Sequence, residues 1–240
     1  MLYFTMNKSD CTGCSCCVSS CPINCISMMQ DEEGFLYPVA SDKCIKCGKC
    51  ENLCPVNNFT KSTKTTFTQT AYCAISKNKN LWKQSASGGA FSEICRAFGN
   101  SDTIVCGAAW DGYNVHHICV DSVDRIPLLC KSKYIASSLE NTFFEIKQYL
   151  ERGKKAIFCG TPCQVAGLKN YIGKDYDNLL LIDLICHGVG SPYVFKACLE
   201  EMEKQFNCSI EMYEFRAKRK FYETDYLSRI KTDKGVEKYL

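Results

Sequence analysis

Helical and extended hydrophobic patterns alternate along the chain beyond about residue 70. Apolar positions three or four residues apart indicate a helix, and short apolar runs between turn residues indicate buried strands. We therefore expect helices over residues 89–98, 137–150, 164–171 and 192–206, and strands over residues 103–110, 115–120, 156–159 and 179–186. The last strand is expected to be fully buried. This alternation predicts an α/β domain with a mixed or parallel sheet.

The first 60 residues differ from the rest in their density of cysteine. Ten of the 20 cysteines lie between Cys11 and Cys54. The stretch from residue 57 to residue 70 is polar, rich in Thr and Lys, and has no cysteine. We therefore predict a cysteine-rich domain over residues 1–60, a linker over residues 61–70 and the α/β domain over residues 71–240.

Twenty cysteines in 240 residues indicate either a disulfide-rich secreted protein or thiolates that bind metal. The amino terminus has no sustained apolar run and no cleavage site of a secretory signal. No window has the roughly 18 to 20 apolar residues that a membrane span needs. We therefore expect a cytoplasmic protein with reduced thiols and no membrane span. Lysine and arginine are scattered, with a formal net charge of +3, so nucleic acid is not an expected partner.

The early cysteines form two copies of one spacing, 33 residues apart. Each copy reads Cys-x-x-Cys-x-x-Cys-x-x-x-Cys-Pro, which is the ligand spacing of bacterial two-cluster ferredoxins, where the fourth cysteine binds the other cluster. We therefore expect an α+β ferredoxin-like module with two 4Fe-4S clusters. Cluster one is predicted to be bound by Cys11, Cys14, Cys17 and Cys54, and cluster two by Cys44, Cys47, Cys50 and Cys21.

Zinc is the alternative to iron–sulfur clusters, because Cys-x-x-Cys pairs also bind zinc. Zinc needs only four ligands and would leave the third cysteine of each loop and both Cys-Pro pairs without a role. Cys16 and Cys25 fall outside the spacing. Cys16 could compete with Cys17 as a ligand, but both extra cysteines are expected to be small packed residues.

Three later motifs lie where predicted strands and helices meet. In SASGGAF, two glycines begin a helix, where free amides suit a phosphate, although such a pair is often only a turn. GTPCQ and CHGVGSP place Cys163 and Cys186 directly after predicted strands, where α/β sheets bind ligands. The alternative is that both are packed strand-end cysteines. His116 and His117 are expected to be ordinary strand residues. The remaining cysteines lack ligand spacing and are expected in the core; they are Cys73, Cys95, Cys106, Cys119, Cys130, Cys159, Cys198 and Cys208.

In this order, SGG, SKYIASS, GTPCQVAGLK, DLICHGVGSP and FRAK behind a two-cluster ferredoxin resemble the coenzyme F-420 hydrogenase/dehydrogenase beta-subunit family. The resemblance covers nearly the whole chain. It implies a flavoprotein in which FAD in the α/β domain shuttles electrons between iron–sulfur clusters and a soluble two-electron carrier. The matching positions imply FAD contacts from Ser87, Gly88, Gly89, Lys133, Tyr134 and Ser137.

Members of this family also bind a third 4Fe-4S cluster near the flavin, and Cys163 and Cys186 match two of its ligands. The other two come from a later Cys-x-x-Cys pair, which this chain lacks after Cys54. The final stretch, RIKTDKGVEKYL, is charged and is expected to form no packed element. Either the chain is a fragment or the third cluster is completed by another subunit. His187 could donate a hydrogen bond to cluster sulfur or to a flavin carbonyl, or it could cap a strand end.

The sequence thus predicts an oxidoreductase that works with a redox partner protein or a soluble carrier, as an oligomer or within a hetero-complex. The alternative is a non-catalytic electron-transfer subunit whose α/β domain is a docking scaffold. A third interpretation is a family member with intact clusters and no partner. No Ser-His-Asp grouping or suitably spaced carboxylate pair supports hydrolysis. The sequence does not name the carrier.

Overall fold

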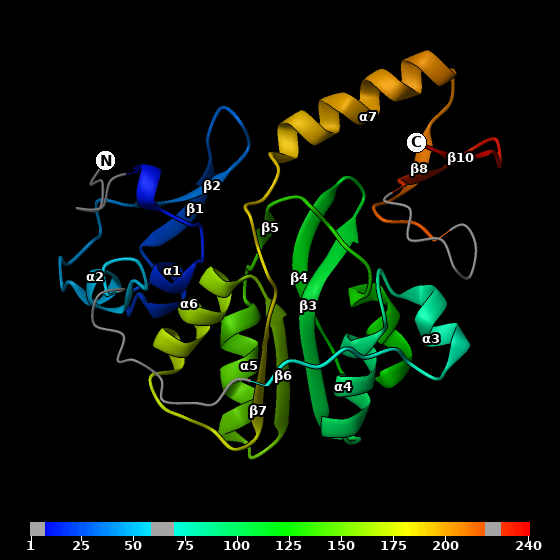
Figure 1. Cartoon of the computed structure of the whole chain (residues 1–240). Coiled ribbons are helices and arrows are strands. Elements are labelled where there is room, and N and C mark those ends of the chain that lie inside the picture. Colours follow the sequence, from blue (N-terminus) through cyan, green and yellow to red (C-terminus); the bar gives the residue numbers. More distant parts are fainter. Residues whose placement is uncertain (1–7, 59–69, 219–226) are drawn as a thin grey trace.

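The computed structural model describes residues 8–58, 70–218 and 227–240. It consists of a ferredoxin-like region followed by an α/β domain, as predicted (Figure 1). The predicted linker, residues 61–70, lies outside the described residues except for residue 70. The elements of the ferredoxin-like region are η1 (Lys8–Asp10), α1 (Cys16–Ser20), β1 (Ile26–Gln30), β2 (Leu36–Ala40) and α2 (Lys49–Leu53).

The two cysteine repeats fold in the same way. In each repeat the third cysteine lies in a five-residue helix, α1 or α2, and the fourth cysteine ends that helix with an extended backbone. Each helix follows a residue in the left-handed region, Ser15 at φ 58° before α1 and Gly48 at φ 72° before α2. Strands β1 and β2 pair as an antiparallel hairpin. Local spacing therefore determines most of this fold.

The α/β domain is built on a five-stranded mixed sheet with the strand order β5-β4-β3-β6-β7. Strands β3 and β4 are antiparallel, and the other neighbouring pairs are parallel. The strands are β3 (Thr103–Asp111), β4 (Asn114–Val120), β5 (Ser137–Ser138), β6 (Lys155–Gly160) and β7 (Leu179–Asp183). The helices are α3 (Lys79–Gln84), α4 (Ala90–Phe98), η3 (Val123–Leu129), α5 (Thr142–Glu151), α6 (Pro162–Ile172) and α7 (Pro192–Phe206).

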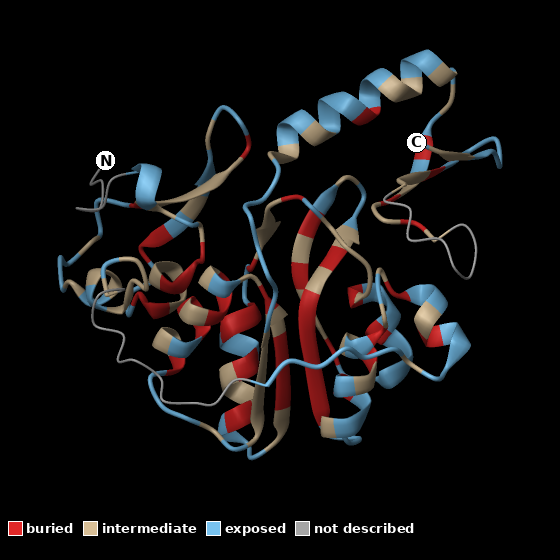
Figure 2. Cartoon of the chain, viewed as in Figure 1, coloured by how far each residue is buried: buried red, intermediate tan, exposed pale blue. Residues whose placement is uncertain are grey.

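Two hydrophobic clusters fill the two faces of this sheet. Ile104 and Phe158 pack with residues of α5 and α6 on one face. Val105 and Ile157 are the strand neighbours of Ile104 and Phe158. They pack with α4 and η3 on the other face, because successive strand side chains point to opposite sides. Figure 2 shows the buried residues concentrated in the central strands and along α5, whereas α7 is largely exposed and buries Leu199.

The final segment of the chain is a packed element, so the expectation that RIKTDKGVEKYL stays unpacked is wrong. Strands β8 (Ile210–Glu214), β9 (Arg229–Thr232) and β10 (Glu237–Tyr239) form an antiparallel sheet in the order β10-β9-β8. Ile230 and Thr232 are buried, and Lys231 between them is exposed. The charges therefore belong to the outer face of a short strand, whose alternation spans too few residues to be recognised in the sequence.

Two predicted elements have different limits in the structure. The helix expected over residues 137–150 begins at Thr142, because Ser137 and Ser138 pair with β4 and Glu140 adopts a left-handed φ of 42°. The strand expected over residues 179–186 ends at Asp183, and it is half-buried because it lies at the edge of the sheet. The residues that follow it are exposed.

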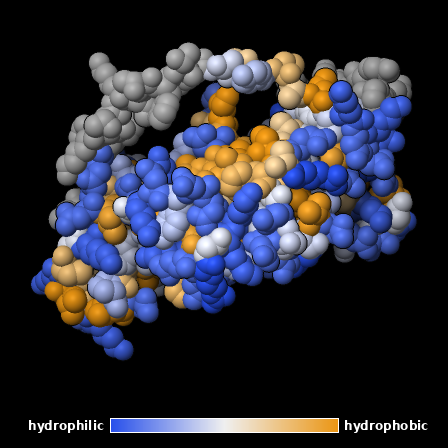
Figure 3. All heavy atoms as spheres, turned by 90° about the horizontal axis from the view of Figure 1, so that it is seen from below, coloured by the Kyte–Doolittle hydropathy of each residue, from blue (hydrophilic) through white to orange (hydrophobic). Residues whose placement is uncertain are grey.

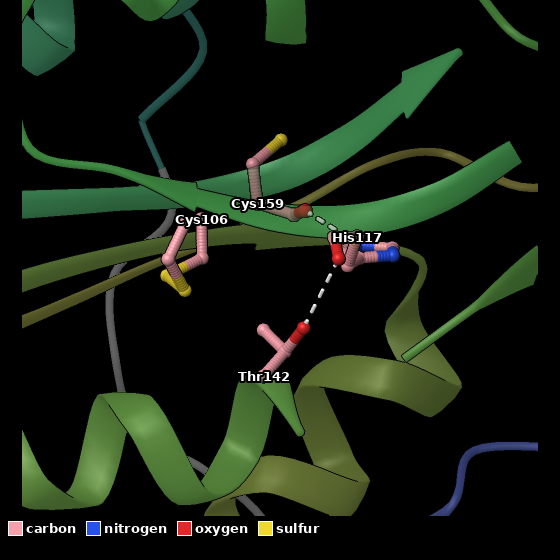
Figure 4. The surroundings of a disulfide bond; sticks show 5 residues. Cys106, His117, Thr142 and Cys159 are labelled. Atoms are coloured by element: carbon pink, nitrogen blue, oxygen red, sulfur yellow. Dashed lines mark hydrogen bonds between the residues drawn. A yellow bond between two sulfur atoms is a disulfide. The ribbon is translucent and has the colours of Figure 1, made fainter. Parts of the chain in front are cut away.

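The expectation of reduced thiols throughout is wrong at Cys106 and Cys119, which form a disulfide between β3 and β4 (Figure 4). The two residues face each other in the strand register, with 4.1 Å between their Cα atoms. Cys95 is buried as expected, whereas Cys73 and Cys198 are exposed rather than in the core. Sequence spacing does not reveal the disulfide because its partners meet only when the strands pair.

Hydrophilic side chains cover most of the face seen from below, with apolar patches between them (Figure 3). Within the described ranges, none of the helices has the length and apolar composition needed to cross a membrane.

Candidate iron–sulfur and flavin site

Two cavities in the ferredoxin-like region each bring together four of the predicted ligands. Cys11, Cys14, Cys17 and Cys54 line the first cavity. Cys21, Cys44, Cys47 and Cys50 line the second cavity. The fourth cysteine of each repeat thus lines the cavity formed by the first three cysteines of the other repeat. Cys16 and Cys50 also reach the first cavity, and Cys25 reaches the second, so the ligand assignment stays a prediction.

Burial governs the ionisation of the thiols around the first cavity. It raises the pKa of Cys14 to about 12 and holds the pKa values of Cys11 and Cys17 above the ordinary value. Thiols in such surroundings keep their protons until a metal replaces them, since a coordinating thiol is deprotonated outright. Cys163 of α6 interacts electrostatically with both Cys11 and Cys14. The first cavity therefore lies close to the α/β domain.

Cys21 and Cys25 lie side by side, with 3.4 Å between their Sγ atoms. Burial opposes ionisation of Cys21, but hydrogen bonds from backbone amides, Cys25 N at 3.3 Å among them, lower its pKa below the ordinary value. Burial raises the pKa of Cys25 to about 12. Of the two, Cys21 loses its proton more readily and is therefore the more suitable metal ligand. Cys16 is 1% exposed and its Sγ lies 3.4 Å from the carbonyl of Leu53, so it is a packed residue as expected.

The α/β domain holds the ferredoxin-like region at two places. Helix α6 packs on α1 and α2, where Asn170 Nδ2 donates to the carbonyl of Leu53 at 2.9 Å. At the start of α7, Tyr193 Oη donates to Gln30 Oε1 at 2.8 Å, and Ser191 Oγ donates to the carbonyl of Glu33. Figure 1 shows the first of these places, with α6 lying between α1 and the sheet.

The SKYIASS segment, residues 132–138, connects to both cysteine motifs of the α/β domain. The backbone amide of Gly190 donates to the carbonyl of Tyr134 at 2.9 Å, and that of Ala136 donates to Gly190 at 3.0 Å. Gln164 Nε2 donates to Ser137 Oγ at 3.0 Å. The GTPCQ and CHGVGSP loops therefore meet this segment at the edge of the sheet where β6 and β7 end.

The FRAK motif joins the same site to the SGG loop. Phe215 packs edge-on against Tyr134, with ring centroids 5.3 Å apart, and stacks on Trp110 at 6.2 Å. Lys218 Nζ donates to the carbonyls of Ser87 and of Trp82 and lies over the indole ring of Trp82. All five motifs that the sequence singled out are thus linked in one region.

The glycines of the SGG loop are required by the backbone. Gly89 has a φ of +89° and caps the amino end of α4. A Cβ at Gly88 would lie 2.1 Å from the carbonyl oxygen of Ala74. Ser87 is exposed, at the end of the loop that Lys218 holds.

Lys133 and Tyr134 have different surroundings. Burial lowers the pKa of Lys133 to about 8, and its Nζ donates to the carbonyl of Cys130 at 2.8 Å. Tyr134 is 51% exposed. Leu184, Ile185 and Val189, in the loop after β7, are also exposed apolar residues, Ile185 to 95%. An aromatic ring system placed here would cover this apolar surface.

Cys163 and Cys186 follow neighbouring strands. Cys163 is the second residue of α6, and its Sγ lies 3.1 Å from Thr161 Oγ1. Cys186 is exposed, and its Sγ accepts a hydrogen bond from the Gly188 amide at 3.4 Å. The amide of Leu184 donates to the carbonyl of Gly160 at 3.0 Å, so the two loops leave the sheet together. His187 is exposed.

Two family models match the sequence. Residues 10–67 match the 4Fe-4S dicluster domain. Residues 153–239 match the family described as the carboxy-terminal part of the beta subunit of coenzyme F420 hydrogenase/dehydrogenase. Residues 153–239 belong to this beta-subunit family. The dicluster match identifies the ferredoxin-like region as an iron–sulfur electron-transfer domain, as its cysteine spacing predicts.

Among solved structures, this chain is similar to a chain of the F420-reducing [NiFe] hydrogenase complex from Methanosarcina barkeri. The TM-score is 0.46 and the identity is 16%, over 70% of this chain and 60% of that chain. This chain therefore spans less than two thirds of that chain's length. No curated protein matches the sequence.

His117 was expected to be an ordinary strand residue, but in the structure it has specific hydrogen-bond partners. It is 4% exposed in the middle of β4, and its Nε2 lies 3.2 Å from the carbonyl of Cys159 (Figure 4). Its Nδ1 lies 3.2 Å from Ser137 Oγ, which also accepts from Gln164. Burial lowers the pKa of His117 to about 4. His117 therefore connects the ends of the SKYIASS and GTPCQ motifs, whereas His116 is half-buried on the other face of the strand.

Proposed function

We propose that this protein is an iron–sulfur flavoprotein oxidoreductase that passes electrons between two 4Fe-4S clusters and FAD, and between FAD and a soluble two-electron carrier. The carrier is a deazaflavin-type coenzyme or another acceptor. The observation that carries this proposal is the series of contacts that links all five motifs, in a chain that also has an electron-transfer domain.

The two cavities support the cluster assignment. Cluster one would be held by Cys11, Cys14, Cys17 and Cys54, and cluster two by Cys44, Cys47, Cys50 and Cys21. Each set of four lines a single cavity, and four thiolates per cluster is the ligand number that a cubane cluster requires.

The residues at the sheet edge fit FAD. The Ser87, Gly88 and Gly89 loop would offer backbone amides at the amino end of α4, where helix amides favour a phosphate. Lys133 adds a cation nearby, and Tyr134 with the apolar loop after β7 would cover the ring system. Ser137 Oγ keeps one lone pair for a donor on the flavin. FAD, when bound, supplies the exchange between one-electron and two-electron transfer.

We further propose that Cys163 and Cys186 are two ligands of a third 4Fe-4S cluster. Their loops leave adjacent strands and run together. The remaining ligands would come from another segment or from a partner subunit. A hetero-complex with a second redox subunit is consistent with the beta-subunit description of the family.

The test is anaerobic reconstitution of the full chain with iron, sulfide and FAD, followed by metal analysis, EPR and flavin absorbance. We expect two ferredoxin-type clusters and stoichiometric FAD, and reduction of a viologen dye through the protein. Two clusters without retained flavin would overturn the flavoenzyme proposal and favour the electron-transfer subunit.

Paired variants separate a flavin site from non-specific binding. Tyr134 and Phe144 are similarly exposed aromatic residues, at 51% and 53%, but Phe144 lies on α5, which is not part of any of the five motifs. Tyr134→Ala should weaken FAD retention, whereas Phe144→Ala should not. Equal retention in the two variants would place the flavin elsewhere.

A further inference from the structure

Helix α6 lies directly against the loop that holds the first cysteine cavity. Gly167 is buried at this contact, and a Cβ built on it would lie 3.2 Å from the Sγ atom of Cys14 and 3.2 Å from its carbonyl oxygen. The absence of a side chain at Gly167 thus permits the approach of the helix backbone to a predicted ligand of cluster one.

Two other residues of α6 interact with residues of the two cysteine loops that line the first cavity. Cys163 lies one helical turn before Gly167 and so shares its face, because residues four apart on a helix are neighbours. Its thiol interacts electrostatically with Cys11 and Cys14. Asn170, on the following turn, donates to the carbonyl of Leu53 at 2.9 Å, directly before Cys54. We call Cys163, Gly167 and Asn170 the junction face.

Both cavities are lined by residues of the ferredoxin-like region, but the loop around the second cavity is more exposed. Cys47 is exposed, and Ile45, on the same loop, is 62% exposed. In Figure 1 the chain between β2 and α2 lies at the outer margin of the molecule, away from the sheet.

We propose that the junction face of α6 is the electron junction between the two domains, so that cluster one exchanges electrons with the α/β domain and cluster two exchanges them with the outside. This inference rests on the proposed function, because it needs FAD as the inner redox centre. The rate of electron transfer falls steeply with distance. Because a predicted ligand of cluster one, Cys14, contacts α6, cluster one is the cluster that should exchange electrons with the α/β domain.

The balance of the reaction follows from this order. Each electron that reduced FAD gives up oxidises the flavin by one equivalent and reduces cluster one, directly or by way of the proposed third cluster at Cys163. Cluster one in turn reduces cluster two. Two such transfers return FAD to its oxidised form and release its protons to solvent. An outside one-electron acceptor then reoxidises cluster two. The reverse direction uses the same steps.

The test uses the reconstituted full chain, with the bound flavin photoreduced in the presence of EDTA as electron donor and cluster reduction followed by freeze-quench EPR. In Gly167→Leu, the added side chain separates α6 from Cys14, and electron arrival at the clusters should slow about tenfold or more. Lys169→Leu, an exposed position on the same helix, is the matched control and should match the wild type.

A second variant tests the order of the clusters. Cys54→Ala removes a predicted ligand of cluster one, and cluster two should then stay oxidised after the flavin is photoreduced. Reduction of cluster two at the wild-type rate in Cys54→Ala, or unchanged rates in Gly167→Leu, would overturn the junction while the proposed function stands. A wild type that retains no flavin would overturn the proposed function, and the junction with it.

Discussion

The hydroxyl oxygen of Ser137 lies 3.2 Å from Nδ1 of His117. Because Nε2 of His117 faces the carbonyl of Cys159, that nitrogen must carry the proton, and the neutral ring then accepts at Nδ1. Ser137 must therefore donate to His117 while accepting from Gln164, whose Oε1 accepts from the Thr161 amide at 3.0 Å. The donor and the acceptor of each hydrogen bond in this series are therefore determined. The series bonds to the backbone on both sides of Gly160, at the Cys159 carbonyl and at the Thr161 amide.

Replacing His117 should loosen this turn. His117→Phe keeps a ring of similar size but removes the donor to the Cys159 carbonyl and the acceptor of the Ser137 hydroxyl proton. We expect a loss of about 2 kcal/mol in the free energy of unfolding. Urea denaturation measures it. His116→Phe, on the half-buried face of the same strand, is the control and should cost clearly less. Equal losses of unfolding free energy in the two variants would show that the hydrogen bonds of His117 add nothing to stability.

The same histidine should make stability depend on pH. Its pKa in the fold is about 4, below the ordinary value of 6.5. As pH falls from about 6.5 to about 4, the unfolded chain binds a proton that the folded protein does not, so stability falls, by about 3 kcal/mol in total. The difference in unfolding free energy between the wild type and His117→Phe, measured by urea denaturation, should therefore fall over this range and reverse its sign towards pH 4. A constant difference would contradict a neutral His117.

Two glycines should respond to alanine for different reasons. Gly88→Ala places a methyl group 2.1 Å from the carbonyl of Ala74, so the SGG loop must move, at a cost on the order of 3 kcal/mol. Gly153 has open space around it but a φ of +73°, so Gly153→Ala should cost only about 1 kcal/mol of backbone strain. Thermal unfolding distinguishes the two. Flavin retention should fall only in Gly88→Ala.

The adjacent thiols of Cys21 and Cys25 should behave differently as ligands. Cys21→Ala should lose cluster two, whereas Cys25→Ala should keep both clusters, because the backbone amides favour the thiolate of Cys21 alone. Iron content and EPR after reconstitution measure the outcome. Loss of the same cluster in both variants would mean that Cys25 also binds iron.

What the sequence predicts well is determined by neighbours along the chain. The cysteine repeats place three ligands in one loop, so spacing alone indicates the cluster module. The long helices and central strands follow from apolar periods that span several turns or alternations. The mixed α/β class and the family resemblance were confirmed for the same reason, because they rest on these patterns and on ordered motifs.

What the sequence misses depends on contacts between distant segments. His117 looks ordinary because its partners, Ser137 and Cys159, are 20 and 42 residues away. The Cys106–Cys119 disulfide needs the register of two strands. The strand around Ile230 is short and charged, and only packing against Leu199 and Ile210 shows which side is inward.

The contacts at Asn170 and Tyr193 have a geometric consequence for the ferredoxin-like region. A body joined at one place can swivel about it, and motion between domains is the usual expectation when their interface is small. Here α6 bonds to Leu53 at the end of α2, and the start of α7 bonds to Gln30 of the β1–β2 hairpin. Two separated attachments remove the swivel. An electron donor that approaches the protein would therefore meet the same outer loop, in the same orientation, at every encounter.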